Sequence, residues 1–389
     1  MPPVDRRIAH LDMDAFYASV ELLRYPQLAG KALVIGGRRR HEADTEAQAF
    51  ERLRDYAGRG VATTCTYEAR ALGVHSGMGL MKAAALAPDA ILLPADFEEY
   101  GRYSRRFKAA VAAIAPRIED RGIDEIYIDL TELPGETVPL AQRIKEAVRE
   151  ATGLSCSIGI APNKLLAKLA SELQKPDGLT VIGPADIAAR IWPLPVRKIN
   201  GVGPRTNARL EALGIRTIGE LARVPLHALV EYFGDSHGRW LAAAANGRDE
   251  RPVVTEHEPK SISRETTFER DLDPRRERDR EALSRILLGL CERLGGDLAR
   301  KGYAARNIGV KLRYADFRIV TRDTTLEQPT DQAQAIRSAA RDCIRRAPLD
   351  RKLRLLGVRA GALVPAGEAP AVRRDTKARD AGESLSLFD

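Results

Sequence analysis

Short apolar runs alternate with helix-spaced apolar positions over two parts of the chain, 1–17 and about 94–184. Runs rich in β-branched residues lie within 8–17, within 122–130 and at 155–160, and each predicts a buried strand. Two helices are predicted from the apolar stripes of Leu140, Ile144, Ala147 and Val148, and of Leu165, Leu166, Leu169 and Leu173. We expect Pro162 to begin the second helix and the run 175–178 to end it. The pattern predicts an α+β layer.

The remaining segments have other patterns and suggest further domains. Residues 18–93 form an insertion between two strands, in which we expect an added helix from Ala47, Phe50, Leu53 and Ala57. Residues 185–250 are helical with many Gly and Pro breaks, and 251–259 has the charges and prolines of a linker. From 260 to 364 strand-like runs alternate with helices, and the polar tail 365–389 is expected to be disordered. A chain of 389 residues has room for two to four domains.

Three carboxylates lie in the first two predicted strands: Asp12, Asp124 and Glu125. Ionised carboxylates at the edge of a core are costly unless cations or hydrogen bonds compensate them. If the three converge, they make an oxygen-rich site suited to Mg²⁺ and to phosphoryl transfer. Neighbours on a regular strand point to opposite faces, so Asp124 and Glu125 share a site only at a strand end, turn or bulge, which Gly122 is expected to supply. Ordinary charges at strand ends are the alternative interpretation.

Composition narrows the class of protein. The chain is 44% hydrophobic and 30% charged, which is typical of globular proteins. We find no apolar run of about 18 residues and no signal-peptide pattern, so we expect no membrane span and a cytoplasmic location. The four cysteines are far apart, which predicts reduced, buried thiols rather than a zinc site.

The positive charge is concentrated in one region. The net charge is +8, and residues 258–364 contain 24 Lys and Arg against 16 Asp and Glu, which accounts for the entire excess. Such a region predicts a surface that follows the phosphates of a nucleic acid. A basic domain that is merely soluble is the alternative.

Two motifs resemble those of a known family. The segment DMDAFYASVE at 12–21 is similar to the opening motif of the Y-family translesion DNA polymerases, and IDEIYIDLT at 123–131 is similar to their second catalytic motif. Within that family, the motifs most resemble those of the bacterial DNA polymerase IV branch. The resemblance implies an α+β, multidomain right-hand polymerase. Its parts would be a palm at 1–17 and 94–184, fingers at 18–93, a thumb with a helix-hairpin-helix at 185–250, a linker at 251–259, a DNA-binding little finger at 260–364 and a tail at 365–389.

The resemblance also implies a metal site. Asp12, Asp124 and Glu125 would be the catalytic residues and would hold two Mg²⁺ ions, with the backbone carbonyl of Met13 as a further ligand. Asp14 has no ligand role in the family, and we expect it to cap the helix that follows.

Nucleotide selection and binding are implied in the same way. Tyr17, with Phe16 as its packing neighbour, would be a steric gate that excludes a 2′-hydroxyl and so selects dNTPs. Tyr67 and Arg70 would grip the β and γ phosphates, and an Arg suits this role because its planar fork binds oxyanions bidentately. Lys168 would reach the triphosphate from the helix that follows the third strand.

Two further segments resemble family elements that bind macromolecules. Gly201, Gly203 and Arg205 lie in a segment similar to a helix-hairpin-helix, whose glycines let backbone N–H groups approach DNA phosphates. In the tail, Leu385, Leu387 and Phe388 resemble the peptide with which bacterial polymerases bind the sliding clamp, although Ser384 stands where that peptide has glutamine.

The function implied is low-fidelity, template-directed DNA synthesis past lesions by a monomer acting on primer-template DNA and dNTPs. A non-catalytic DNA- and clamp-binding scaffold with the same fold is the first alternative, but it would not need all three carboxylates. A nucleotidyl cyclase with a similar palm is the second, but it would not need the basic C-terminal region.

Overall fold

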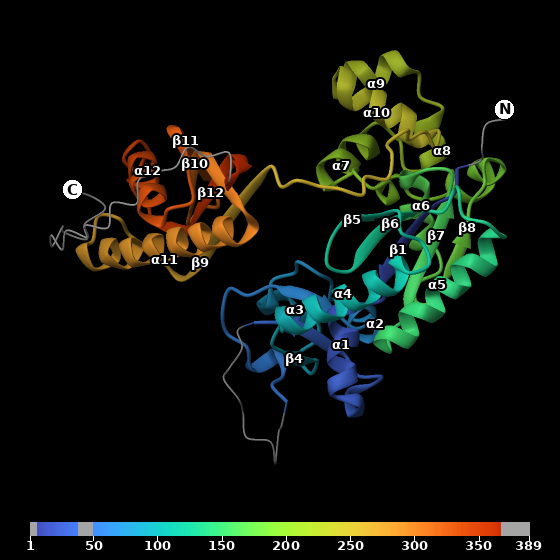
Figure 1. Cartoon of the computed structure of the whole chain (residues 1–389), viewed down its shortest axis with the longest axis horizontal. Helices are drawn as coiled ribbons and strands as arrows, with labels where there is room; N and C mark the ends of the chain where they lie inside the picture. The colour runs from blue at the N-terminus through green and yellow to red at the C-terminus, as the bar shows by residue number, and fades with distance from the viewer. Residues whose placement is uncertain (1–5, 38–49, 367–389) are drawn as a thin grey trace. The chain divides into compact units, whose positions relative to one another are not determined.

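The computed structural model describes residues 6–37 and 50–366, and the chain divides into two compact units between Glu256 and His257. This division falls inside the segment predicted as a linker. Figure 1 shows that each unit has its own strands and helices. Across the described residues, every helix is too short or too polar to span a bilayer. All four cysteines are buried and unpaired, as predicted.

A five-stranded sheet with the order β5-β6-β1-β7-β8 forms the centre of the first unit. Its strands are β1 (Ile8–Met13), β5 (Ile118–Asp120), β6 (Glu125–Asp129), β7 (Cys156–Ala161) and β8 (Leu179–Val181). The three strands predicted from the sequence are β1, β6 and β7, and β1 runs antiparallel between the other two. The predicted α+β layer is therefore confirmed.

Helices cover both faces of this sheet: α1 (Phe16–Arg24), α4 (Phe97–Ala112), α5 (Thr137–Thr152) and α6 (Lys164–Ser171). Side chains alternate along β1, so Ala9, Leu11 and Met13 enter the core shared with α1, α4 and α5. His10 and Asp12 lie on the opposite face, where α6 packs. One face of β1 therefore contributes to the apolar core, and the other face carries the polar side chains of His10 and Asp12.

The predicted ends of α6 are wrong. The helix begins at Lys164 rather than at Pro162, and Asn163 is its cap, because the Asn163 side chain accepts a hydrogen bond from the Leu166 N–H at 3.0 Å. The helix ends at Ser171, before the predicted stop at 175–178.

Residues between α1 and α4 form a smaller layer, which follows a 3₁₀ turn at Pro26–Leu28. It contains a sheet of order β3-β2-β4, made of β2 (Leu33–Gly36), β3 (Ala62–Cys65) and β4 (Ile91–Leu93), with helices α2 (Tyr67–Ala71) and α3 (Leu80–Leu86). The added helix is wrong for the described part of its range, where a 3₁₀ turn spans Leu53–Asp55. Leu53 enters the core of the small sheet, whereas Phe50 packs against Tyr25. The two side chains therefore do not form one apolar helix face. Ala47 lies outside the described residues.

Short helices follow β8, as predicted for 185–250. They are α7 (Pro204–Ala212), α8 (Ile218–Ala222), α9 (Leu226–Phe233) and α10 (Asp235–Ala245), after 3₁₀ turns at Pro184–Asp186 and Val196–Lys198 and a π turn at Ile187–Ile191. Their apolar side chains share one core with α6.

The second unit is an antiparallel sheet of order β11-β10-β12-β9 that carries two helices on one face. Its elements are β9 (Ser261–Leu272), α11 (Glu277–Lys301), β10 (Tyr303–Tyr314), β11 (Ile319–Thr330), α12 (Ala333–Arg345) and β12 (Leu353–Pro365). The predicted alternation of strands and helices is confirmed. Near Gly309 and Gly357, Lys311 and Arg359 help to line a hollow of about 380 Å³. Most of the predicted tail, from 367 onward, lies outside the described residues.

Candidate active site

The pairing of β1 with β6 brings the carboxylates together. Asp12 lies directly opposite Glu125 in the antiparallel register, so their side chains share one face. Asp124 precedes the first residue of β6, and its carbonyl accepts a hydrogen bond from the Met13 N–H at 3.0 Å. Asp124 and Glu125 therefore lie at the start of a strand, which is one of the places where neighbouring side chains can share a site. Gly122 lies in the preceding bend without a left-handed conformation, and an added Cβ would make only ordinary contacts, so the turn does not need a glycine.

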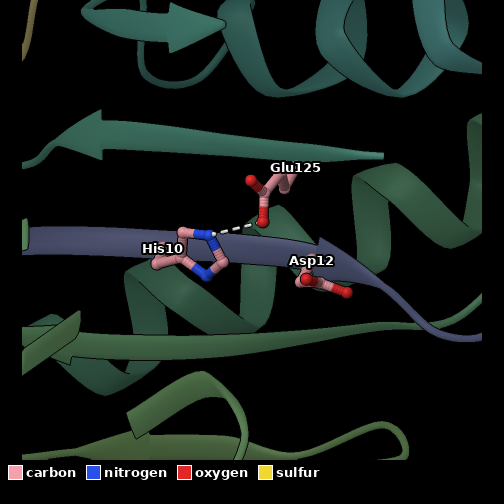
Figure 2. A group of neighbouring side chains, drawn as sticks. All are labelled: His10, Asp12 and Glu125. Atoms are coloured by element: carbon pink, nitrogen blue, oxygen red, sulfur yellow. Dashed lines mark ion pairs between the residues drawn. The ribbon is translucent and has the colours of Figure 1, made fainter. Parts of the chain in front are cut away.

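Basic side chains compensate this negative charge. Figure 2 shows His10 and Asp12 on one strand and Glu125 on its neighbour. The His10 Nε2 lies 3.3 Å from Glu125 Oε2, and its Nδ1 is 2.8 Å from the Ser171 hydroxyl. Lys168 forms an ion pair with Glu125, and the Lys175 Nζ lies 2.6 Å from Asp12 Oδ1.

The environments of the three carboxylates differ. Burial raises the pKa of Asp12, although Lys175 acts in the opposite direction. Burial and the adjacent charge of Glu125 raise the pKa of Asp124. The His10 imidazole and the Lys168 ammonium hold the pKa of Glu125 at about 2, so this carboxylate remains ionised.

Oxygen and nitrogen donors here suit a divalent cation. One potential ligand atom from each of His10, Asp12 and Glu125 falls within 4.8 Å of the others. Asp124 lies beside this group and shares a cavity of about 320 Å³ with Asp12 and Met13. Hard oxygen donors next to a cavity fit Mg²⁺-like ions, which keep positions free for water and substrate phosphates.

The same cavity connects Asp12 and Asp124 with three of the residues implied for the nucleotide, whereas Tyr67 and Lys168 do not line it. Phe16 and Tyr17, at the start of α1, line it together with Arg70. The Arg70 guanidinium lies 4.8 Å from the centre of the Tyr67 ring. The Tyr67 hydroxyl is buried and has no hydrogen-bond partner among the described residues.

Asp14 does not cap α1, and this prediction is wrong. The cap residue is Ala15 in a left-handed conformation, without a side-chain hydrogen bond. The buried Asp14 carboxylate instead accepts hydrogen bonds at 2.8 Å from the Ser155 and Ser157 hydroxyls and from the Asp177 N–H. It joins β1 to β7 and to the segment after α6, because those donors outcompete the helix terminus.

Comparison with known sequences identifies the family. Residues 11–172 match the impB/mucB/samB family, 259–371 match its C-terminal domain and 184–215 match the IMS family HHH motif. The chain is 40% identical over 363 residues to the DNA polymerase IV of Alkalilimnicola ehrlichii, covering 92% of this chain and 96% of that protein. The chain belongs to the DNA polymerase IV branch of the Y family.

Other relatives agree with this assignment. The DNA polymerase IV of Streptomyces coelicolor is 40% identical over 356 residues, which are 90% of this chain and 70% of that protein. Among solved structures, a Y-family DNA polymerase chimera, Dbh-Dpo4(243-245)-Dbh, matches with a TM-score of 0.77 and 26% identity over 92% of this chain and 99% of that one. The fold is that of an α+β multidomain polymerase, and the chain is a divalent-metal-dependent DNA polymerase for primer-template DNA and dNTPs.

In this polymerase, the structure places the matched HHH motif around a tight turn. Gly201 has φ +112°, and an added Cβ would lie 2.7 Å from the Trp240 ring. Gly203 precedes α7, whose second residue is the exposed Arg205. The backbone there needs a glycine at 201 on both conformational and steric grounds.

Two residues near the carboxylates are missing from the sequence-based prediction. His10 is a polar residue inside an apolar run, two positions before Asp12, so strand alternation could have placed it on the same face. Lys175 carried no such signal, because its partner Asp12 is distant in sequence and the segment 175–178 has the composition of a turn.

Proposed function

We propose that the chain performs low-fidelity, template-directed DNA synthesis past lesions, adding dNTPs to a primer 3′ end. The observation that carries this proposal is one cavity lined by Asp12, Asp124, Tyr17 and Arg70 in a chain of this family. It supports the non-catalytic scaffold less well, since a scaffold would not need the carboxylates beside that cavity.

For the metal site, we propose that Asp12, Asp124, Glu125 and the Met13 carbonyl hold two Mg²⁺ ions. Two such ions, when bound, favour deprotonation of the primer hydroxyl and stabilise the leaving pyrophosphate. Asp12 and Asp124 orient the reacting groups from the cavity wall. With cations bound at these carboxylates, Lys168 would no longer be needed to balance the charge of Glu125, and its ammonium would be free to contact the triphosphate.

The nucleotide is proposed to lie in the cavity with its sugar over Tyr17, which Phe16 supports at a ring distance of 5.6 Å. The unpartnered Tyr67 hydroxyl and the adjacent Arg70 offer hydrogen-bond donors to the β and γ phosphates. Arg70 lines the same cavity as Asp12 and Asp124, which supports a phosphate site next to the proposed metal site.

For DNA, we propose two contacts. The turn at Gly201 and Gly203 offers backbone N–H groups to the phosphates of one DNA strand, and Arg205 adds a positive charge beside them. The open sheet face of the second unit, with Arg359, offers a second basic surface. These contacts are independent of sequence, as a polymerase requires.

The tail is proposed to bind a sliding clamp through Leu385, Leu387 and Phe388, which lie outside the described residues. The chain is proposed to act as a monomer in the cytoplasm. Deleting 385–389 should leave synthesis without a clamp unchanged and should abolish stimulation by the clamp. Ser384→Gln should strengthen stimulation.

The decisive test is primer extension with Mg²⁺ and dNTPs on undamaged and damaged templates. Insertion opposite a lesion that stops a replicative polymerase is the expected result. A chain that binds the primer-template tightly but adds no nucleotide would support the scaffold instead.

A further inference from the structure

The ring of Tyr17 lies flat against a second aromatic ring. Tyr100, on α4, stacks on it with ring centres 4.3 Å apart and planes inclined by 14°. Phe97, one turn earlier on α4, meets the Tyr17 ring edge-on at 5.9 Å. One flat face of Tyr17 is therefore covered by α4, while Tyr17 also lines the cavity.

Tyr100 is itself fixed in place. Its side chain is fully buried, and its hydroxyl donates a 2.7 Å hydrogen bond to Glu21 Oε1, which is also buried. Burial and the carboxylate raise the pKa of Tyr100, so the phenol stays protonated and keeps donating. Glu21 lies one turn after Tyr17 on α1, so the same helix supplies both the gate ring and the anchor of the ring behind it.

We infer that Tyr100 is a positioning residue that sets how strictly the chain rejects ribonucleotides. A gate that works by bulk discriminates only if its ring cannot move away from the added 2′-hydroxyl. Tyr17 cannot turn toward α4, because Tyr100 fills that space and cannot itself recede from Glu21. The inference rests on the proposed role of Tyr17.

The test compares the kcat/KM for an rNTP with that for the matching dNTP in the full-length protein. Replacing the flat ring by Tyr100→Leu should raise this ratio on the order of tenfold, the range expected for losing one shape-determining contact. Tyr100→Phe keeps the stacked ring but loses the hydrogen bond to Glu21, so its ratio should lie between those of the wild type and Tyr100→Leu, closer to the wild type. Tyr100→Met replaces the ring by a flexible side chain that still fills much of the space. It provides the test if the leucine variant does not fold.

Phe107→Leu is the matched control. Phe107 is fully buried on the same helix and packs edge-on against Phe16 at 6.4 Å. Its replacement should lower the melting temperature like Tyr100→Leu, but because Phe107 reaches Tyr17 only through Phe16, it should change the rNTP/dNTP ratio much less. If both leucine variants raise the ratio equally, general loosening of the core explains the effect and the inference is wrong.

Tyr17→Ala separates this inference from the proposed function. If Tyr17→Ala relaxes sugar selection and neither Tyr100→Leu nor Tyr100→Met does, the gate is confirmed and the role of Tyr100 is refuted. If Tyr17→Ala leaves the ratio unchanged, the proposed gate itself is wrong, and so is the inference that depends on it.

Discussion

At the scale of single residues, the carboxylate site depends on charges held in half-buried positions. Asp124→Asn preserves the shape of its side chain but removes one negative charge from the proposed metal site. Metal-ion stabilisation of a transition state is worth several kcal/mol, so kcat for primer extension should fall by about 100-fold or more.

The measurement is single-nucleotide extension under saturating DNA, with DNA affinity measured in parallel. Glu132→Gln is the control. Asp124 precedes β6, and Glu132 is a highly exposed carboxylate that follows the same strand. It should leave kcat unchanged. Near-normal extension by Asp124→Asn would remove Asp124 from the catalytic set.

Residues differ in how far sequence alone could place them. Asp12, Asp124 and Glu125 were predictable as a set because they sit in two short motifs, and strand pairing then brings the motifs together. Lys175 was not, since only tertiary folding brings it to Asp12. Asp14 was misjudged because a local helix cap competes with three distant donors, and no local pattern reveals those donors.

At the scale of elements, α6 shows that spacing does not determine environment. Lys164 and Lys168 are four residues apart and so share a helix face, but Lys164 is buried and lies 2.5 Å from the buried Glu119. The Lys164 ammonium also donates to the Pro252 carbonyl at 3.2 Å, and Glu119 accepts from the Val254 N–H at 2.8 Å. Through these contacts, the pair links residues 252–254, near the end of the first unit, to the central sheet.

Breaking that buried pair should therefore cost stability. Lys164→Met removes the buried cation of Glu119 and leaves it only the half-exposed Arg121, whose guanidinium lies 3.4 Å away, so the free energy of unfolding should fall by about 3 kcal/mol. Denaturant titration of the full chain measures this. The matched variant Lys168→Met, at a more exposed pair, should lose no more than about 1 kcal/mol while impairing synthesis. Equal losses of stability would contradict the difference in burial.

The turn before α7 gives a second prediction at this scale. Gly201→Ala places a methyl group 2.7 Å from the Trp240 ring at a backbone φ of +112°, so it should destabilise the turn and weaken DNA binding. Gly203→Ala is the control for stability, because its Cβ would meet nothing within 4 Å and its φ is −78°. Melting temperatures that are the same for both variants would show that the turn does not depend on Gly201.

At the scale of the whole molecule, the sequence predicted the class of fold better than the orientation of its charges. Residues 258–364 hold the full positive excess, and composition alone could locate that excess in a region. It could not say which face carries each charge. In the second unit, Arg264 pairs with Asp297 on α11 at 2.5 Å, whereas Arg359 lies on the adjacent strand beside Gly309. The strand register pairs Arg264 with Val358 and Arg359 with Ser263, so the two arginines lie on opposite faces of the sheet. Composition does not reveal that register.

This separation yields a test of the DNA surface with two arginines from paired strands. If the open face binds phosphates, Arg359→Gln removes one contact, and the slope of log affinity against log salt should become shallower by about 0.9 on duplex DNA. Arg264→Gln removes the same charge from the helix-covered face, so it should leave the slope unchanged. Titrations of primer-template binding across a range of salt concentrations measure both slopes. If the two variants shift the slope equally, net charge rather than this face governs binding, and the proposed contact is wrong.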